Sequence, residues 1–216
     1  MSAARAARVA AQKKHLSATE QDPEARATWQ AELAAELGGD EFLFLDETST
    51  QLAMTRSRAR APRGERARSQ QPRNHGENIT RLAVLAPTGV IAPLVFAGAL
   101  DGPIFAQWVR EWLVPELHPG QTVILDNLSV HKNAAARTAI EAAGCQLRLL
   151  PAYSPDFNPI ELVFAKIKTA VRGAAARTFA DLVDALDAAI SAVTATDARA
   201  CYRHCGYPLA PDNQPP

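Results

Sequence analysis

The sequence predicts an α/β fold in which a mixed sheet is flanked by helices, and three observations support this. Apolar residues alternate in 79–86 and 90–97 on either side of a Pro-Thr-Gly turn, the pattern of an antiparallel hairpin. Farther along, the apolar runs 122–126 and 146–150 are separated by a helical stretch, as in parallel strands joined by a crossover. In addition, 47% of the 216 residues are hydrophobic, which is enough for one domain to bury a core.

Residues 1–40 are expected to form an arm and a linker helix ahead of the main domain. Residues 1–21 are rich in alanine and basic side chains and show no apolar face. Asp22 and the proline after it have the pattern of an N-cap and a first helical residue. Apolar side chains then recur every four residues, at Trp29, Leu33 and Leu37. We expect a short amphipathic helix that lies on the main domain, which comprises residues 41–206.

The main domain opens with two short strands and an arginine-rich connection. The apolar run 42–46 is bounded by charge, as in a buried strand, and 48–55 is expected to form a second, half-polar strand. Residues 56–73 contain seven arginines, one acid and no periodicity, so a long loop or open hairpin is expected. Arginine makes bidentate contacts to phosphate, although a solvated surface loop is the alternative role.

Helices follow the hairpin and alternate with the last two strands. The apolar spacing predicts helices over 101–117, 132–143, 159–172, 178–190 and 197–204. Residues 207–216 are expected to form a disordered tail.

Charge, cysteine content and hydropathy narrow the class of protein. The 23 basic side chains balance 23 acidic ones, so net charge alone predicts no nucleic-acid partner. The cysteines, Cys145, Cys201 and Cys205, form no evident disulfide framework and fit a reducing compartment. Cys201, His204 and Cys205 lie on one helical turn but do not complete a zinc site, so packing is their expected role. Because no apolar run reaches the roughly 18–20 residues of a membrane span, we expect a soluble, cytoplasmic protein.

Two acids follow apolar strands at what should be the same edge of the sheet. Asp46 ends the run FLFL, and Asp126 ends TVIL. One acid at a strand end is often only a turn former, but two such strands are less easily explained as unrelated turns. Open α/β sheets place functional sites at this carboxyl edge. Glu47 should point to the opposite face if its strand continues, so Asp46 is the stronger candidate.

Glu161 is the candidate for a third acid, and its position has two explanations. Asn158, Pro159 and Glu161 match an N-cap, a first-turn proline and the glutamate of a capping box, which needs no chemistry. A carboxylate in the first turn also faces the edge where the strands end, and the preceding YSPDFNP is unusually specific for a helix start. Asp156 is an alternative third acid, in a loop where a turn role is expected. The residues alone leave these explanations open.

Taken together, these segments resemble the DDE transposases of bacterial insertion sequences, in the mariner-like superfamily. The similarity is carried by LDET followed by APRGER, by ILDNLSVHKN and by LPAYSPDFNPIE, in this order along the chain. It extends from about Asp22 to Tyr207. The resemblance implies an RNase H-like fold, a mixed five-stranded sheet with helices on both faces, and it makes residues 41–206 the catalytic domain.

The resemblance also implies a metal-dependent reaction on DNA. Asp46, Asp126 and Glu161 fall on the family's metal-binding carboxylates, which hold two Mg²⁺ ions that Mn²⁺ can replace. Two ions ~3.5–4 Å apart can activate a nucleophile and stabilise a leaving oxyanion at one phosphorus. On this basis Asp46 bridges the ions, while Asp126 and Glu161 each bind one. The implied activity is strand cleavage at the ends of a mobile element, followed by attack of the freed 3′-OH on target DNA.

Double-stranded DNA, both element terminal repeats and target, is therefore the expected partner. Basic and polar side chains beside the acids are expected to hold its backbone largely without reading sequence. The residues predicted for this role are Arg56, Arg58, Arg60, Arg63, Arg66, Arg68, Arg73, Asn127, His131, Lys166 and Lys168. Asn127 fits a turn equally well, and His131 fits a solvated or packed side chain.

The resemblance further implies a homodimer that acts on paired DNA ends. Relatives carry an N-terminal helix-turn-helix region that recognises the terminal repeats, and the segment 1–40 is too short to supply one. The chain is therefore expected to be the catalytic part, with end recognition supplied by a separately encoded helix-turn-helix protein. Two alternatives stay open, a catalytically idle remnant or DNA-binding accessory that keeps the fold, and a general RNase H-like nuclease.

Overall fold

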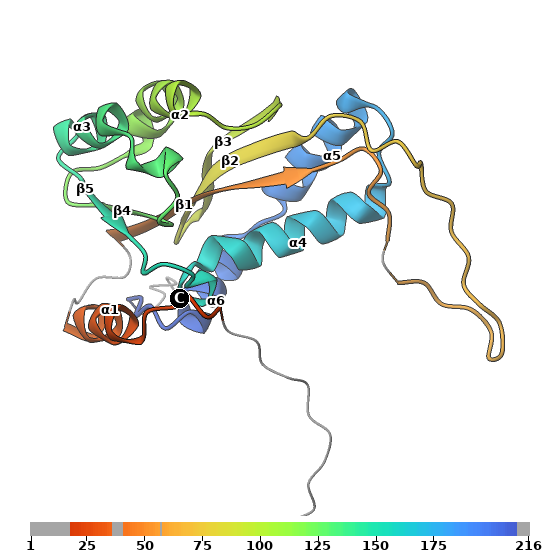
Figure 1. The fold of residues 1–216 in the computed structure, drawn as a ribbon, viewed down its shortest axis with the longest axis horizontal. Coiled ribbons are helices and arrows are strands. Elements are labelled where there is room, and N and C mark those ends of the chain that lie inside the picture. Colours follow the sequence, from red (N-terminus) through yellow and green to blue (C-terminus); the bar gives the residue numbers. More distant parts are fainter. Residues whose placement is uncertain (1–17, 36–40, 57, 211–216) are drawn as a thin grey trace, which may run out of the picture.

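A five-stranded sheet in the order β3-β2-β1-β4-β5 forms the centre of the molecule (Figure 1). The computed structural model describes residues 18–35, 41–56 and 58–210. β1 pairs antiparallel with β2, and β2 with β3, whereas β1, β4 and β5 are parallel neighbours. The mixed sheet is therefore confirmed. Its strands are β1 (Phe42–Thr50), β2 (Ile79–Ala86), β3 (Gly89–Ala97), β4 (Thr122–Leu125) and β5 (Gln146–Leu149).

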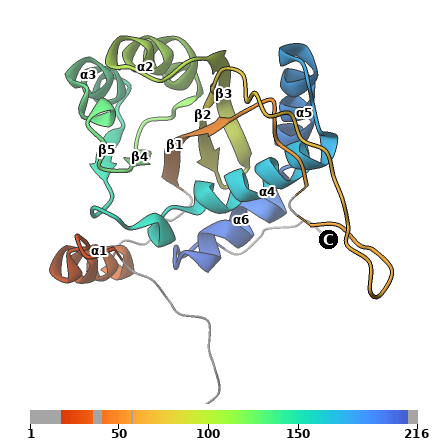
Figure 2. The same cartoon turned by 45° about the vertical axis from the view of Figure 1, so that its right-hand side comes forward.

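Helices cover both faces of the sheet (Figure 2). One face packs against α4, α5 and α6, with α1 beside them, and Phe44 belongs to this core. The other face packs against α2, its π-helical continuation and α3, and Leu43 and Leu45 belong to that core. Successive strand residues point to opposite faces, so an uninterrupted apolar run such as FLFL is buried on both sides. The helices are α1 (Pro23–Ala35), α2 (Gly102–Trp108), the π-helix Val109–Leu113, α3 (Ala134–Ala142), α4 (Pro159–Ala174), α5 (Phe179–Ser191) and α6 (Ala195–His204).

The strands predicted at 42–46 and 48–55 are one strand, so the predicted break between them is wrong. β1 runs without interruption from Phe42 to Thr50. Its second half keeps a full antiparallel register with β2, from Asp46 opposite Ala83 to Thr50 opposite Ile79. The Asp-Glu pair has the composition of a turn, but the ladder with β2 satisfies the backbone groups and keeps the chain extended.

The connection between β1 and β2 is a long excursion, and its described residues, 51–56 and 58–78, form no helix or strand. The loop predicted at 56–73 is confirmed over these residues, whereas 51–55, predicted as strand, also belong to the loop. The connection runs out beyond the end of the sheet and returns to it (Figure 1). Residues 58–78 of this connection are exposed throughout. Six of the seven arginines lie in this exposed stretch at one end of the sheet, and Arg56 just before it is exposed as well.

The two ends of the described chain pack onto the same core. Trp29 and Leu33 of α1 are buried against the α4 face, and the Trp29 indole donates to the Tyr207 hydroxyl at 3.3 Å. Tyr207 is 1% exposed, so the predicted tail at 207–216 is wrong at its first residue. Most of the predicted arm, Leu37 and residues 211–216 lie outside the described residues. Within the described ranges, no helix combines the length and the apolar character needed to span a membrane.

Candidate active site at the carboxyl edge of the sheet

The pairing register places Asp46 and Asp126 next to each other. β1 and β4 run parallel, and their last paired residues are Leu45 and Leu125, so the two aspartates are the next residues of both strands. Neighbouring strands lie about 4.8 Å apart, which brings the two backbones close at this point. β4 ends here, whereas β1 continues against β2. The end of β4 therefore opens the space in front of Asp46.

Asp46 is a buried carboxylate with a hydrogen-bond donor on each oxygen. Only 6% of the residue is exposed. Its Oδ1 accepts from the Glu47 backbone N–H at 2.8 Å, and its Oδ2 accepts from Asn158 Nδ2 at 2.8 Å. Burial, and then the negative charges of Glu161, Asp126 and Glu47, raise the pKa of the Asp46 carboxyl to about 8. A bound cation would relieve this accumulation of negative charge.

Glu161 approaches the site from the first turn of α4 without capping that helix. Asn158 occupies the N-cap position, but its side chain makes no capping hydrogen bond, because its amide is turned toward Asp46. Within the described part of the chain, the Glu161 carboxylate has no hydrogen-bond donor, so the reciprocal bonds of a capping box are missing. The capping-box explanation of Glu161 is therefore wrong. Its charge instead acts on Asp46, more strongly than that of any other acid.

His131 lies buried between two carboxylates, which corrects the prediction that it contacts DNA. Its side chain is fully buried, with Nδ1 2.6 Å from Asp126 Oδ1 and Nε2 2.8 Å from Glu47 Oε2. Burial by itself lowers the pKa of His131, but the hydrogen bond to Asp126 and the contact with Glu47 outweigh it and raise the pKa to about 9. The imidazolium thus ties Asp126 to β1. Glu47 points away from Asp46, as predicted, and that orientation brings it to His131.

A pocket of about 320 Å³ opens between the acids and the loop that precedes α4, and Asp46, Asp126 and Glu161 all line it. This volume is at the lower end of the range for small-ligand sites, about 300–1,000 Å³. As the side chains stand, no three His, Cys, Asp or Glu residues of the described ranges are close enough to enclose a metal ion. The donors nevertheless suit Mg²⁺, which takes oxygen ligands, keeps several waters and is usually held by one or two carboxylates. Asp126 Oδ2 and the Glu161 carboxylate accept no hydrogen bond from the described residues, so both are available to a cation.

The arginines predicted to hold DNA are exposed, and two of them reach the flank of α4. All seven lie at exposed positions of the β1–β2 connection. Arg56 and Arg58 line a second pocket of about 600 Å³ together with Arg172 of α4. A Cβ atom added to Gly173 would lie 3.7 Å from the Arg56 guanidinium, so this arginine passes close to the helix backbone. The start of the connection is therefore packed beside α4.

The two predicted lysines of α4 face different surroundings. Lys168 is two helical turns beyond Glu161 and hence on the same side of the helix. Burial lowers the pKa of Lys168, and the charge of Glu161 opposes this effect. Lys166 instead pairs with Asp197 of α6 at 2.7 Å. The structure therefore brings Lys168 to the acidic site and leaves Lys166 at the α4–α6 contact.

Arg81 on β2 is a buried cation that no sequence pattern signals. It lies opposite Thr48 in the sheet and is 2% exposed. Among the described residues, none accepts a hydrogen bond from its three guanidinium nitrogens. Burial lowers the pKa of Arg81 to about 10, and its charge acts on Lys168. Lys168 in turn interacts with the charges of Glu161 and Asp46.

Three further residues of the pocket were also missed. Asn127 was predicted and is an exposed lining residue, but Lys132, Tyr153 and Asn158 line the same pocket and were not predicted for it. Each belongs to a motif already identified, VHKN or YSPDFNP. These motifs closely follow Asp126 or precede Glu161 in the chain, and this proximity to a candidate acid could have indicated that they line the pocket.

Known proteins match this chain in sequence profile and in fold. Residues 41–183, more than half of the chain, match the sequence profile described as DDE superfamily endonuclease. No curated protein sequence matches the chain. The five-stranded mixed sheet with helices on both faces is the RNase H-like fold, as the resemblance implied.

Solved structures of Mos1 transposase share this fold. The chain is similar to the Mos1 strand transfer complex, with a TM-score of 0.71 and 15% identity over 91% of this chain and 63% of that one. For the mariner Mos1 paired end complex with Mg, the TM-score is 0.69 at 16% identity, over 92% and 63%. For the catalytic domain of Mos1 mariner transposase, it is 0.65 at 14% identity, over 90% and 92%. The chain thus spans less than two thirds of the Mos1 chains in the two complexes and nearly all of the catalytic domain.

Proposed function

The chain belongs to the DDE superfamily endonucleases, and we propose that it cuts DNA strands with Asp46, Asp126 and Glu161 in a divalent-metal-dependent reaction. One observation carries this proposal. The register of β1 and β4 makes the two aspartates neighbours, and α4 presents a glutamate without a capping role to the same pocket. Three acids from three elements that repel one another are costly to a fold unless they serve a bound cation.

The three carboxylates are the proposed holders of two Mg²⁺ ions, which Mn²⁺ can replace. When bound, such ions supply an activated nucleophile and stabilise the leaving oxyanion at one phosphorus. Asp46 would help to hold both ions, because the charges of Glu161 and Asp126 both act on its carboxylate. The Mos1 paired end complexes with Mg and with Mn support this choice of ion.

The surrounding residues orient the acids. Asn158 and the Glu47 backbone N–H fix both oxygens of Asp46. His131 holds Asp126 through Oδ1, so that Oδ2 keeps a lone pair for a cation. Since the pKa of His131 is about 9, the imidazolium stays charged over the neutral range and offsets part of the acidic repulsion. These contacts would keep the acids in place before any ion or substrate arrives.

Beyond cleavage, we infer that the protein joins the freed 3′-OH to target DNA, as in transposition. The support is the similarity in fold to the Mos1 strand transfer complex and paired end complex. The proposed DNA partners are element ends and target, held by a homodimer, with a separately encoded helix-turn-helix protein supplying end recognition. Such substrates would place the protein in the cytoplasm, with the DNA.

A nicking assay tests the catalytic claim. Purified protein is incubated with supercoiled plasmid and Mn²⁺ or Mg²⁺, and nicked circles are quantified for wild type, Asp126→Asn and Asp184→Asn, an exposed acid of α5 that serves as the control. Wild type and Asp184→Asn should nick equally, and Asp126→Asn should lose at least ~100-fold in rate, about 2.7 kcal/mol. Equal nicking by all three would refute the assigned site. Inactive wild type would indicate the idle remnant.

A salt titration tests the proposed DNA interface. The logarithm of the DNA-binding constant falls linearly with the logarithm of the salt concentration, and each lost phosphate contact makes this slope less steep by about 0.9. The double variant Arg63→Glu and Arg66→Glu should therefore bind duplex DNA more weakly, with a slope reduced by about 2. Arg110→Glu is the matched control, because Arg110 is exposed and lies on the π-helix after α2, on the other face of the sheet from α4. An unchanged slope in the double variant would show that these arginines do not face DNA.

A further inference from the structure

Two exposed apolar side chains stand at the acidic pocket. Tyr153 is 59% exposed and Leu128 is 48% exposed. Both line the pocket that contains Asp46, Asp126 and Glu161. Exposed large apolar side chains beside a polar site mark a surface where another molecule binds. A single such residue would be unremarkable, but here two come from different loops and meet at the proposed catalytic pocket.

The backbone of Tyr153 is strained. Its φ is 54°, in the left-handed region that glycine adopts freely and that residues with a β-carbon avoid. Glycine would therefore suit the turn better than tyrosine. Local backbone preference does not explain the tyrosine ring, and strain of this kind is concentrated at ligand-binding sites.

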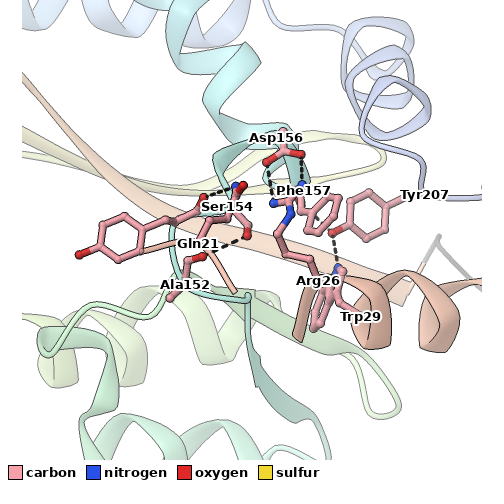
Figure 3. Close-up of polar contacts among 9 residues, drawn as sticks. Gln21, Arg26, Trp29, Ala152, Ser154, Asp156, Phe157 and Tyr207 are labelled. Carbon is pink, nitrogen blue, oxygen red and sulfur yellow. Dashed lines mark hydrogen bonds and ion pairs between the residues drawn. The ribbon is translucent and has the colours of Figure 1, made fainter. Parts of the chain in front are cut away.

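Contacts from Gln21, just before α1, and from Arg26 of α1 hold the loop that carries Tyr153 (Figure 3). Gln21 Nε2 donates to the Tyr153 carbonyl at 2.9 Å. Arg26 binds Asp156 through two contacts of 2.6 and 3.0 Å, and its guanidinium lies 4.1 Å from the centroid of the Phe157 ring. Among the described residues, none makes a hydrogen bond or ring contact with the Tyr153 side chain. The backbone is thus fixed, while the ring is available to a ligand.

The Leu128 side of the pocket is fixed in the same way. The Leu128 backbone N–H donates to Asp126 Oδ1 at 3.1 Å, and the same oxygen is hydrogen-bonded to His131 Nδ1. The carboxylate therefore sets the position of the leucine, and the leucine side chain remains exposed. Two anchored apolar groups flank the acids.

A nucleobase is the ligand that matches this rim. If the acids act on a phosphodiester, the groups next to that phosphate are its sugar and base. Aromatic rings stack on any base regardless of sequence, because every base has a π-face. We propose that Tyr153 stacks on the base adjoining the phosphate held at the acids, and that Leu128 packs against the same nucleotide. This inference rests on the proposed DNA substrate.

Abasic scanning tests the proposal with the full chain. Binding is measured by fluorescence anisotropy to short duplexes with a single-stranded extension, in which one abasic nucleotide is moved stepwise across the junction. Tyr153→Ala should weaken binding to intact DNA by roughly 5- to 150-fold, which corresponds to about 1–3 kcal/mol, while Tyr153→Phe should bind like wild type. Phe179→Ala, which removes an exposed ring on α5, is the matched control.

The abasic position separates stacking from a structural role. At one position, the loss of the base should weaken wild type as much as Tyr153→Ala does, and the two proteins should then bind equally. Equal binding of intact DNA by wild type and Tyr153→Ala would overturn the proposal. The proposal would also be overturned if Tyr153→Ala weakened DNA binding by the same factor at every abasic position. That result would indicate collapse of the loop or a protein partner for the ring. If wild type nicks plasmid but shows neither effect, only this inference fails; if it neither nicks nor binds DNA, the proposed function fails as well.

Discussion

Replacing Asp46 by asparagine should make the metal-free protein more stable at slightly alkaline pH. Burial and neighbouring acids raise the pKa of Asp46 to about 8, from 3.8. The unfolded chain releases this proton near pH 4 and the folded chain keeps it until about pH 8, so the folded state binds more protons and stability falls as pH rises between them. At about 1.4 kcal/mol for each pH unit, the penalty reaches roughly 6 kcal/mol by pH 8.

The asparagine removes this penalty but loses one acceptor. Its amide accepts only through Oδ1, so either the Glu47 N–H or Asn158 Nδ2 loses its partner, at about 1–3 kcal/mol. Asp46→Asn should therefore be about 3–5 kcal/mol more stable than wild type at pH 8 and about equal to it near pH 5. Saturating Mg²⁺ should reverse the order at pH 8, because a ligand that binds only the folded wild type stabilises it alone.

Urea denaturation without metal and with Mg²⁺, at several pH values, measures these differences. Glu41→Gln, an exposed acid just before β1, controls for a general change in charge. If the free energy of unfolding depended on pH in the same way for wild type and Asp46→Asn, the electrostatic reasoning would be refuted. An Mg²⁺ response that survives in Asp46→Asn would refute the metal assignment for this residue.

Three other substitutions test the neighbours of the acids. His131→Asn should destabilise by about 3–5 kcal/mol near pH 6, because it leaves two carboxylates facing each other without a cation. The pKa of His131 is raised to about 9, so this stabilisation is complete below pH 6.5 and is lost through pH 9; a gap that stays constant to pH 10 in denaturant titrations would contradict the assignment. Asn158→Ala should cost about 1–3 kcal/mol and weaken Mg²⁺ binding in thermal-shift titrations, and an unaltered Mg²⁺ midpoint would show that the amide does not hold Asp46 for metal. Arg81→Met should stabilise by about 1–4 kcal/mol in calorimetry, because it removes a buried charge without a partner among the described residues; a lower melting temperature would mean that the guanidinium is compensated.

The two aspartates were predictable because each follows an apolar run that is visible in sequence, although only β4 ends at its acid and β1 continues past Asp46 to Thr50. Asp46 and Asp126 each follow an unbroken apolar run, and the hairpin and crossover spacing correctly predicted which strands are antiparallel and which parallel. What sequence lacks is register. Only the pairing of Leu45 with Leu125 establishes that the two aspartates are direct neighbours.

The remaining residues depend on tertiary contacts that leave no local signal. Glu161 has the spacing of a helix cap, and only the turn of Asn158 toward Asp46 removes that explanation. A histidine before a helix has the same pattern whether it is solvated, as on a DNA-binding surface, or buried between carboxylates, as His131 is. Glu47 was set aside because it points to the opposite face, and for that reason it reaches His131.

The contacts of α1 bear on how the protein is shortened for biochemical work. A fragment shortened only on its N-terminal side, to residue 41 where the sequence profile begins, would retain every carboxylate of the pocket. It would lack Gln21, Arg26 and Trp29, and with them the support of the 151–157 loop and of Tyr207. Such a fragment would keep all three acids but would leave the loop at 151–157 without the contacts that Gln21 and Arg26 make to it. Weak activity in it would then report the missing helix and not the chemistry of the carboxylates.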